Sequence, residues 1–378
     1  MDTNTAPAPG ACRASGDPDR IEFYEHAIPG FAAQALDACY GALFSSLAYL
    51  RLSGRLGPAT CTYVAYAGGA VRSIFLFERE GDLARVLNAA IRTEPDEVRR
   101  FADYLFGRLP GVRRIAFPGV HMGRLRLAYP CQRFLAGEDI VISFAGTAEE
   151  YAARLGRSTR KILRRHAAAL GARHPGAGYR LVPGAAQEGL VERIADWNRQ
   201  HMAARDRVSA YGERDVRQVA ALAAGAGMVG TVVAGTRVRA GTVCCRVGCS
   251  IYLLMTGFDG EYGEFGLGML CNYWTVMECL RMQCRDINLM GGRLPYKYSL
   301  LGRVRAFDSL AIYRSRGALL RHGGEALRTA LRGHARQARF ALLECERKDG
   351  MAARLVARAL DAWRAAKRSW RGLGSTRR

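Results

Sequence analysis

The sequence predicts an α/β (α+β) protein made of two halves with mixed sheets, followed by a helical, basic C-terminal tail. A glycine-linked hairpin, a helix and a strand follow one another over residues 61–117, which is an α/β order. A second series of strands, a glycine-bearing turn, a helix and a strand covers residues 228–289. With 378 residues and 49% hydrophobic content, the chain is long enough for two domains or one domain of two units.

The first half is expected to span residues 21–146. Residues 1–20 are rich in Ala, Pro, Gly and Asp without an apolar period, so we expect a disordered lead-in. Gly68-Gly69 between two apolar runs is a two-residue hairpin signal. The patterns of this half predict, in order, a helix over 31–49, strands over 61–67 and 70–77, a helix over 95–109 beginning with Pro95, and strands over 112–117 and 140–144.

The second half is expected to span residues 147–315. It begins with Thr147 as a helix N-cap and Glu150 three residues later, the pattern of a capping box. The helix that follows ends near Gly171 and carries a basic run, which is either a solvated face or a contact for phosphate or an acidic substrate. Further elements are predicted, in order, as a strand over 179–182, helices over 190–202 and 216–224, and strands over 228–234 and 241–247.

The stretch after these strands organises the half. The apolar run Ile251–Met255 predicts a buried strand, and the turn 263–268, Gly-Glu-Phe-Gly-Leu-Gly, precedes a helix predicted over 269–283. The first N–H groups of a helix have no helical partner and lie at the positive end of its dipole, so this turn predicts an anion site suited to phosphate. Neither G-x-G-x-x-G in this turn nor a P-loop Gly-Lys-Ser/Thr is found, which argues against nicotinamide and ATP sites.

This turn resembles the acyl-CoA pyrophosphate loop of the GNAT N-acyltransferase superfamily, written Q/R-x-x-G-x-G/A. Gly266 and Gly268 match its two glycines, whereas Gly263 stands where the family usually has Gln or Arg. The strand 286–289, the turn 290–292 and the basic run 158–165 resemble the double-GNAT, cellulose-biosynthesis (CelD-like) branch, which is related to Fem-type transferases. The resemblance implies two tandem GNAT-like acyl-CoA N-acyltransferase halves. It also implies acetyl-CoA, or another acyl-CoA, held by Gly263, Phe265, Gly266, Leu267, Gly268 and Met269.

Acyl transfer to an amine needs a neutral amine, a polarised thioester carbonyl and a proton for the leaving thiolate. The resemblance implies that Tyr296 is the acid on the thiol side or a substrate contact, and that Asp286 or Glu264 is the base. Arg160 and Lys297 are the candidate substrate contacts. Each has a simpler alternative: Asp286 as a strand-start cap, Glu264 as an exposed loop charge, Lys297 as a surface ion and Arg160 as part of a solvated helix face.

The cysteines do not predict a metal site. Cys244-Cys245-x-x-x-Cys249 lacks a second pair at zinc spacing, because the candidate Cys279 and Cys284 lie on or just after a helix among apolar residues. We expect reduced core cysteines and no metal. His201 is expected to pack on its helix and not to act as a base.

The charge of the chain and its lack of targeting patterns indicate which binding partners and which location to expect. The net charge is +22, and residues 316–378 contain sixteen Lys and Arg against five Asp and Glu. An apolar stripe over 351–370 in this tail can lie on an anionic membrane, dock on a protein partner or pack on the chain itself. Without an apolar run of membrane length or a signal-peptide pattern, the chain is expected in the cytoplasm, with peripheral attachment at the inner membrane surface as an open alternative.

The leading prediction is an acyl-CoA-dependent N-acyltransferase. It would act by direct attack of an amine of a sugar, an amino acid or an envelope or polysaccharide precursor. One alternative is a Fem-type transferase that uses aminoacyl-tRNA, the only reading that predicts a nucleic-acid partner and salt-dependent RNA binding. Another is a non-catalytic, membrane-associated adaptor of a polysaccharide biosynthesis complex.

Overall fold

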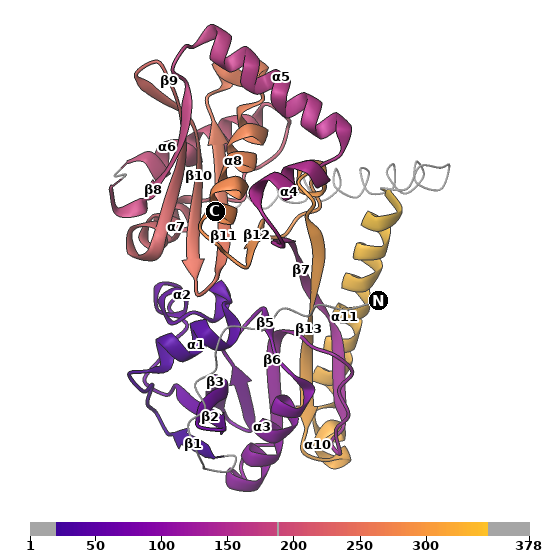
Figure 1. The fold of residues 1–378 in the computed structure, drawn as a ribbon. Helices are drawn as coiled ribbons and strands as arrows, with labels where there is room; N and C mark the ends of the chain where they lie inside the picture. Colours follow the sequence, from indigo (N-terminus) through magenta and orange to yellow (C-terminus); the bar gives the residue numbers. More distant parts are fainter. Residues whose placement is uncertain (1–19, 187–188, 347–378) are drawn as a thin grey trace, which may run out of the picture.

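One mixed sheet joins two α/β halves in the computed structural model, which describes residues 20–186 and 189–346 (Figure 1). The strand order is β1-β2-β3-β4-β6-β13-β7-β12-β11-β10-β9-β8, with β5 paired to β6. Helices cover the sheet in each half, and each half has its own hydrophobic core. This confirms the predicted α/β class with mixed sheets. Residues 1–19 of the predicted lead-in 1–20, and the stripe 351–370, lie outside the described residues.

The first half contains the hairpin predicted at Gly68-Gly69, where both glycines have positive φ (+57° and +79°). The helix predicted over 31–49 is broken, because Gly41 ends α1 in the left-handed conformation (φ +53°) and a 3-10 turn, Leu43–Ser45, follows. The elements are β1 (Ile21–Tyr24), α1 (Ala32–Tyr40), α2 (Leu47–Leu52), β2 (Cys61–Ala67), β3 (Ala70–Glu80), β4 (Leu83–Val86), β5 (Ile91–Arg92), α3 (Pro95–Arg108) and β6 (Arg114–His121).

The second half begins with the capping box predicted at Thr147: the Thr147 N–H donates to Glu150 Oε2 (2.9 Å), and the Glu150 N–H donates to Thr147 Oγ1 (3.2 Å). The single helix predicted from there is two, because Leu155 and Gly156 are extended. The elements are α4 (Ala148–Arg154), α5 (Arg157–Arg173), β8 (Gly178–Pro183), α6 (Leu190–Ala203), α7 (Glu213–Ala226), β9 (Gly227–Ala234), β10 (Arg237–Val247), β11 (Ser250–Phe258), α8 (Leu267–Arg281), β12 (Asp286–Asn288) and α9 (Pro295–Ser299).

Two long strands connect the halves. β7 (Cys131–Ser143) and β13 (Arg303–Tyr313) pair antiparallel along most of their length. β13 also pairs with β6 and contributes Leu310 and Ile312 to the core of the first half, whereas β7 contributes Ile140 and Ile142 to a core of the second. Residues 303–313, assigned to the second half by sequence, thus complete the sheet of the first, so position 146 divides the chain but not the sheet.

The predicted tail helix begins within the described residues as α10 (Arg316–Arg321) and α11 (Gly323–Glu346). α11 lies along β7 and β13 (Figure 1). In the described part of the chain, no helix combines the length and the hydropathy needed to cross a membrane.

Candidate active site

The sheet opens on one side of β11, because the neighbouring strand β12 is much shorter. β11 pairs in parallel with β12 only over Ser250–Tyr252 and Asp286–Asn288, and then continues to Phe258 with no strand beside it on that edge among the described residues. The chain turns away after β12, where Met290 has a positive φ (+61°) and donates its N–H to Asn288 Oδ1 (2.7 Å). A strand edge without a partner presents backbone N–H and C=O groups to whatever lies beside it.

Side chains from α6 and the loop before α7 approach this open edge. The Tyr211 hydroxyl donates to the Leu254 carbonyl, and Asn198 Nδ2 donates to the Thr256 carbonyl (2.9 Å). Neither residue was singled out from the sequence, because nothing local marks a side chain that reaches a strand some fifty residues away.

Tyr296, predicted as the thiol-side acid, lies on α9 just after this turn. Burial raises the pKa of its hydroxyl to about 12, and the nearby Tyr211 adds to the rise. A phenol with this pKa keeps its proton at neutral pH and can donate it. The structure therefore brings Tyr296 and the open edge of β11 into one neighbourhood.

The glycine turn is a 3-10 helix, Gly260–Phe265, that leads directly into α8. Gly266 is the left-handed N-cap of α8 (φ +57°). Its N–H donates to Gly263 O (3.1 Å) and its carbonyl accepts from the Met269 N–H (3.0 Å), so two of the predicted amides are used internally. In contrast, the N–H groups of Leu267 and Gly268 have no acceptor among residues 20–186 and 189–346. These two amides are the part of the predicted anion site that is available to a ligand.

The side chains in the turn differ in their environment. Phe265 and Leu267 are buried in the core, so only their backbone can face a ligand, and Gly263 and Glu264 are exposed. At Gly268 an added Cβ would meet the Phe258 ring at 3.0 Å. This close approach explains why position 268 is glycine.

His166 of α5 packs over Gly266. A Cβ at position 266 would lie 2.0 Å from His166 Nδ1, and this buried nitrogen has no hydrogen-bond partner within the described part of the chain. Desolvation lowers the pKa of the imidazole, and Arg165 lowers it further. A buried polar atom without a partner beside two free amides fits an anionic ligand at this place, so the residues present are compatible with a phosphate group. His166 was not singled out from the sequence. The nearest pattern considered there as a phosphate contact was the basic run 158–165, which ends one residue before it.

The two predicted substrate contacts have protein partners. The Arg160 guanidinium donates to the Ala153 carbonyl of α4 (3.2 Å). Lys297 is not a surface ion: it is buried, and its ammonium donates to the carbonyls of Met290 (3.0 Å) and Gly291 (2.6 Å). Burial lowers the pKa of Lys297 to about 8, against the opposing effect of Asp139. Lys297 thus holds the turn at which the chain leaves the sheet.

Asp286 and Glu264, the two candidate bases, are not brought together. Asp286 begins β12 beside Ser250 at the start of β11, whereas Glu264 follows the end of that nine-residue strand. At 3.3 Å per residue, β11 separates the two ends by about 26 Å. Asp286 Oδ2 instead accepts from Arg285 Nε and Arg305 Nη2, both at 3.4 Å.

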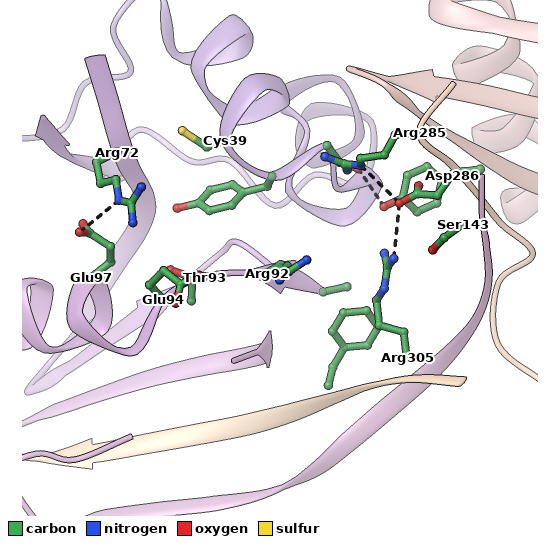
Figure 2. A pocket seen from close by; sticks show the side chains of 15 residues that line it. Cys39, Arg72, Arg92, Thr93, Glu94, Glu97, Ser143, Arg285, Asp286 and Arg305 are labelled. Atoms are coloured by element: carbon green, nitrogen blue, oxygen red, sulfur yellow. Dashed lines mark hydrogen bonds and ion pairs between the residues drawn. The ribbon is translucent and has the colours of Figure 1, made fainter. Parts of the chain in front are cut away.

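Asp286 lines a cavity of about 390 Å³ between the two halves (Figure 2). The first half contributes Arg72, Arg92, Glu94 and Glu97, and the second contributes Arg285, Asp286 and Arg305. Glu97 is buried, accepts from the Ser73 hydroxyl (2.6 Å) and lies 3.9 Å from the Arg72 guanidinium. Four cationic and three anionic side chains thus surround one space. Sequence reasoning missed this cavity because its walls come from segments about two hundred residues apart.

The cavity extends to the place where the sheet parts. Tyr252, which lines it, is the last β11 residue paired with β12, and its hydroxyl donates to the Gly41 carbonyl of the first half (3.1 Å). The open edge of β11 begins at the next residue. The cavity therefore lies near the start of the open edge of β11, and the glycine turn follows the end of the same strand.

Comparison with known proteins agrees with this geometry. A family model described as an acetyltransferase (GNAT) domain matches residues 157–298, a range that runs from the first residue of α5 through the glycine turn and into α9. Over this range the second half is therefore similar to GNAT acetyltransferase domains. No curated protein matches the chain.

The solved structure of FemX shares the fold, and two further solved structures are similar at lower TM-scores. The structure of FemX has a TM-score of 0.50 and 11% identity, over 73% of this chain and 95% of that one. L-PGS from Bacillus licheniformis has a TM-score of 0.44 and 10% identity, over 77% and 93%. A tandem GNAT protein from the clavulanic acid biosynthesis pathway has a TM-score of 0.36 and 13% identity, over 78% and 99%. At 11% identity the likeness to FemX concerns the fold alone, and the CelD-like branch stays a prediction.

Proposed function

We propose that this chain transfers an acyl group from an acyl-CoA, with acetyl-CoA as the first candidate, to the amine of a small acceptor that also carries an anionic group. The observation that carries the proposal is the parting of β11 from β12 beside the two free amides of Leu267 and Gly268. These amides would hold the phosphates, and the unpaired edge of β11 would run beside the acyl-bearing arm. Bound acyl-CoA would supply the thioester that the acceptor amine attacks.

Tyr296 is the residue best suited to the leaving group. Its pKa of about 12 keeps the hydroxyl protonated at neutral pH, so it can give a proton to the thiolate as the carbon–sulfur bond breaks. Lys297 acts on Tyr296 as a positioning residue, because it fixes the turn that precedes α9. No covalent intermediate on the enzyme is needed when the amine attacks the thioester directly.

The cavity between the halves is the proposed acceptor site. Its volume suits a small molecule, and its arginines can bind a carboxylate or phosphate while Asp286, Glu94 or Glu97 contacts the amine. In this arrangement Asp286, on the acceptor side, is the base that takes the proton lost by the amine, whereas Glu264, the alternative base, lies after the other end of β11 on the donor side. The acceptor classes predicted from the sequence, a sugar, an amino acid or an envelope or polysaccharide precursor, fit when they carry both groups.

A second candidate is a Fem-type transferase that takes its acyl group from an aminoacyl-tRNA. The fold shared with FemX and the exposed basic side chains of α5 favour it. The donor distinguishes the two candidates, because tRNA binding would weaken steeply with salt and acetyl-CoA would not bind.

Titration calorimetry with acetyl-CoA tests the proposal. We expect the unaltered chain to bind and Gly268→Glu to weaken binding at least about thirtyfold, because a carboxylate beside the two amides repels phosphate. Gly260→Glu is the matched control: it adds the same charge eight residues earlier, at the start of the 3-10 turn that precedes α8, where a Cβ meets nothing within 4 Å. Equal binding by both variants would place the diphosphate elsewhere. Binding of aminoacyl-tRNA without acetyl-CoA binding would favour the second candidate.

A further inference from the structure

The outer face of the two C-terminal helices exposes leucines. Leu320 is 80% exposed, Leu327 and Leu331 are each 61% exposed, and Leu342 is 42% exposed. Residues 327, 331 and 342 of α11 are separated by four and eleven positions, which places them on one side of the helix. Burying a leucine is favourable, so a row of exposed leucines on one helix face indicates a surface that another body covers.

Arginines border this leucine row. Residues 316–342 contain six arginines, all of them exposed, and a single carboxylate, Glu325, which pairs with Arg114 of β6. In the described part of the chain no carboxylate pairs with any of the six. Arg328 and Arg332 each follow a leucine of the row by one position, and Arg339 lies on the same border.

The opposite face of α11 is anchored, so the leucines cannot simply rotate inward. Ala326 is buried, and its carbonyl accepts from Gln132 Nε2 of β7 (3.2 Å). Gly333 lies so close to β7 that an added Cβ would be 2.4 Å from the Phe134 side chain. Figure 1 shows α11 lying along β7 and β13 at the side of the molecule.

We propose that this α11 face, made of Leu327, Leu331, Leu342, Arg328, Arg332 and Arg339, docks on the surface of an anionic lipid bilayer. A helix with a leucine row beside an arginine row lies in the plane of the interface, with the leucines among the acyl chains and the guanidinium groups on the lipid phosphates. Charge complementarity selects this occupant: an apolar protein partner would leave the arginines unmatched, and RNA would leave the leucines exposed. The function of the catalytic half is not needed for this docking.

The effect of the arginines can be estimated. Each basic residue near an anionic membrane surface strengthens association about fivefold. Removing three of them, as in Arg328→Glu/Arg332→Glu/Arg339→Glu, should therefore weaken binding by about a hundredfold or more. The leucines contribute separately, because their burial does not depend on salt.

Co-sedimentation of the full chain with vesicles tests the proposal. We expect binding to mixed phosphatidylcholine and phosphatidylglycerol vesicles, little binding to pure phosphatidylcholine, and the hundredfold loss in the triple arginine variant. The matched control is Arg193→Glu/Arg214→Glu/Arg217→Glu, which makes the same charge change on exposed positions of α6 and α7 and should lower binding less than about threefold. Leu327→Ser/Leu331→Ser should also weaken binding, whereas Leu52→Ser on α2 should not.

Three results would overturn the proposal. The unaltered chain could bind both vesicle types equally or not at all. The α11 triple variant could bind as well as its control, which would place the lipid contact elsewhere. The leucine double variant could bind the vesicles as tightly as the unaltered chain, which would show that the leucines do not enter the bilayer. Circular dichroism of each variant establishes that it is folded.

Discussion

The buried Lys297 makes the stability of this protein depend on pH in a direction that can be worked out. Its ammonium is held by the carbonyls of Met290 and Gly291 at the turn where the chain leaves the sheet, and burial lowers its pKa from 10.5 to about 8. Between pH 8 and 10.5 the unfolded chain therefore binds more proton at this site than the folded chain does. Stability from this residue must rise with pH across that range.

The size of the effect follows from the pKa shift. One pKa unit corresponds to about 1.4 kcal/mol, so the shift of Lys297 corresponds to about 3 kcal/mol of unfolding free energy, absent below pH 8 and complete above pH 10.5. Lys297→Met removes this titration but leaves two buried carbonyls without a donor, at a cost of about 1–3 kcal/mol each. The variant is thus expected to be less stable at every pH, and by a margin that grows as pH rises.

Urea denaturation of both proteins at several pH values between 7.5 and 10.5 measures the difference in unfolding free energy. Other titrating groups are common to both proteins and cancel in this difference. We expect the advantage of the unaltered chain over Lys297→Met to increase by about 3 kcal/mol across the range. An advantage that stays constant, or that shrinks with rising pH, would show that the folded state does not lower the pKa of Lys297.

The remaining predictions concern the proposed reaction. Tyr296→Phe should lower kcat for acyl transfer about a hundredfold while leaving KM for the acyl-CoA unchanged, because the proton donor is lost and the phosphate contacts stay. Steady-state kinetics with a thiol-detecting reagent measures both constants. An unaltered kcat would show that Tyr296 does not act in the reaction. Arg285→Ala/Arg305→Ala should raise KM for an anionic acceptor about tenfold or more without changing the Kd for acetyl-CoA, since both arginines line the cavity between the halves. An increased Kd for acetyl-CoA with an unchanged acceptor KM would reverse the assignment of the two sites.

Several features could be predicted from the sequence because they depend on neighbouring residues alone. Gly68-Gly69 sets a hairpin through its own backbone freedom, and Thr147 with Glu150 caps a helix through two hydrogen bonds three residues apart. The succession of strand, glycine turn and helix over 251–281 is equally local. These signals were sufficient for the fold class and for locating the two free amides at the start of α8.

What only the tertiary structure decided depends on residues that are far apart in the chain. Asp286 and Glu264 lie close in sequence, yet the length of β11 separates them, and Asp286 faces arginines of a cavity that both halves build. The pairing of β7 with β12 of the second half, and of β13 with β6 of the first, could not be read from the sequence, because the apolar pattern of a strand records that it is buried and not which strand it pairs with. The burial of Lys297 has the same cause only in part: the carbonyls that accept from its ammonium lie six and seven residues earlier in the chain, whereas Asp139 on β7 comes near it only in the folded protein.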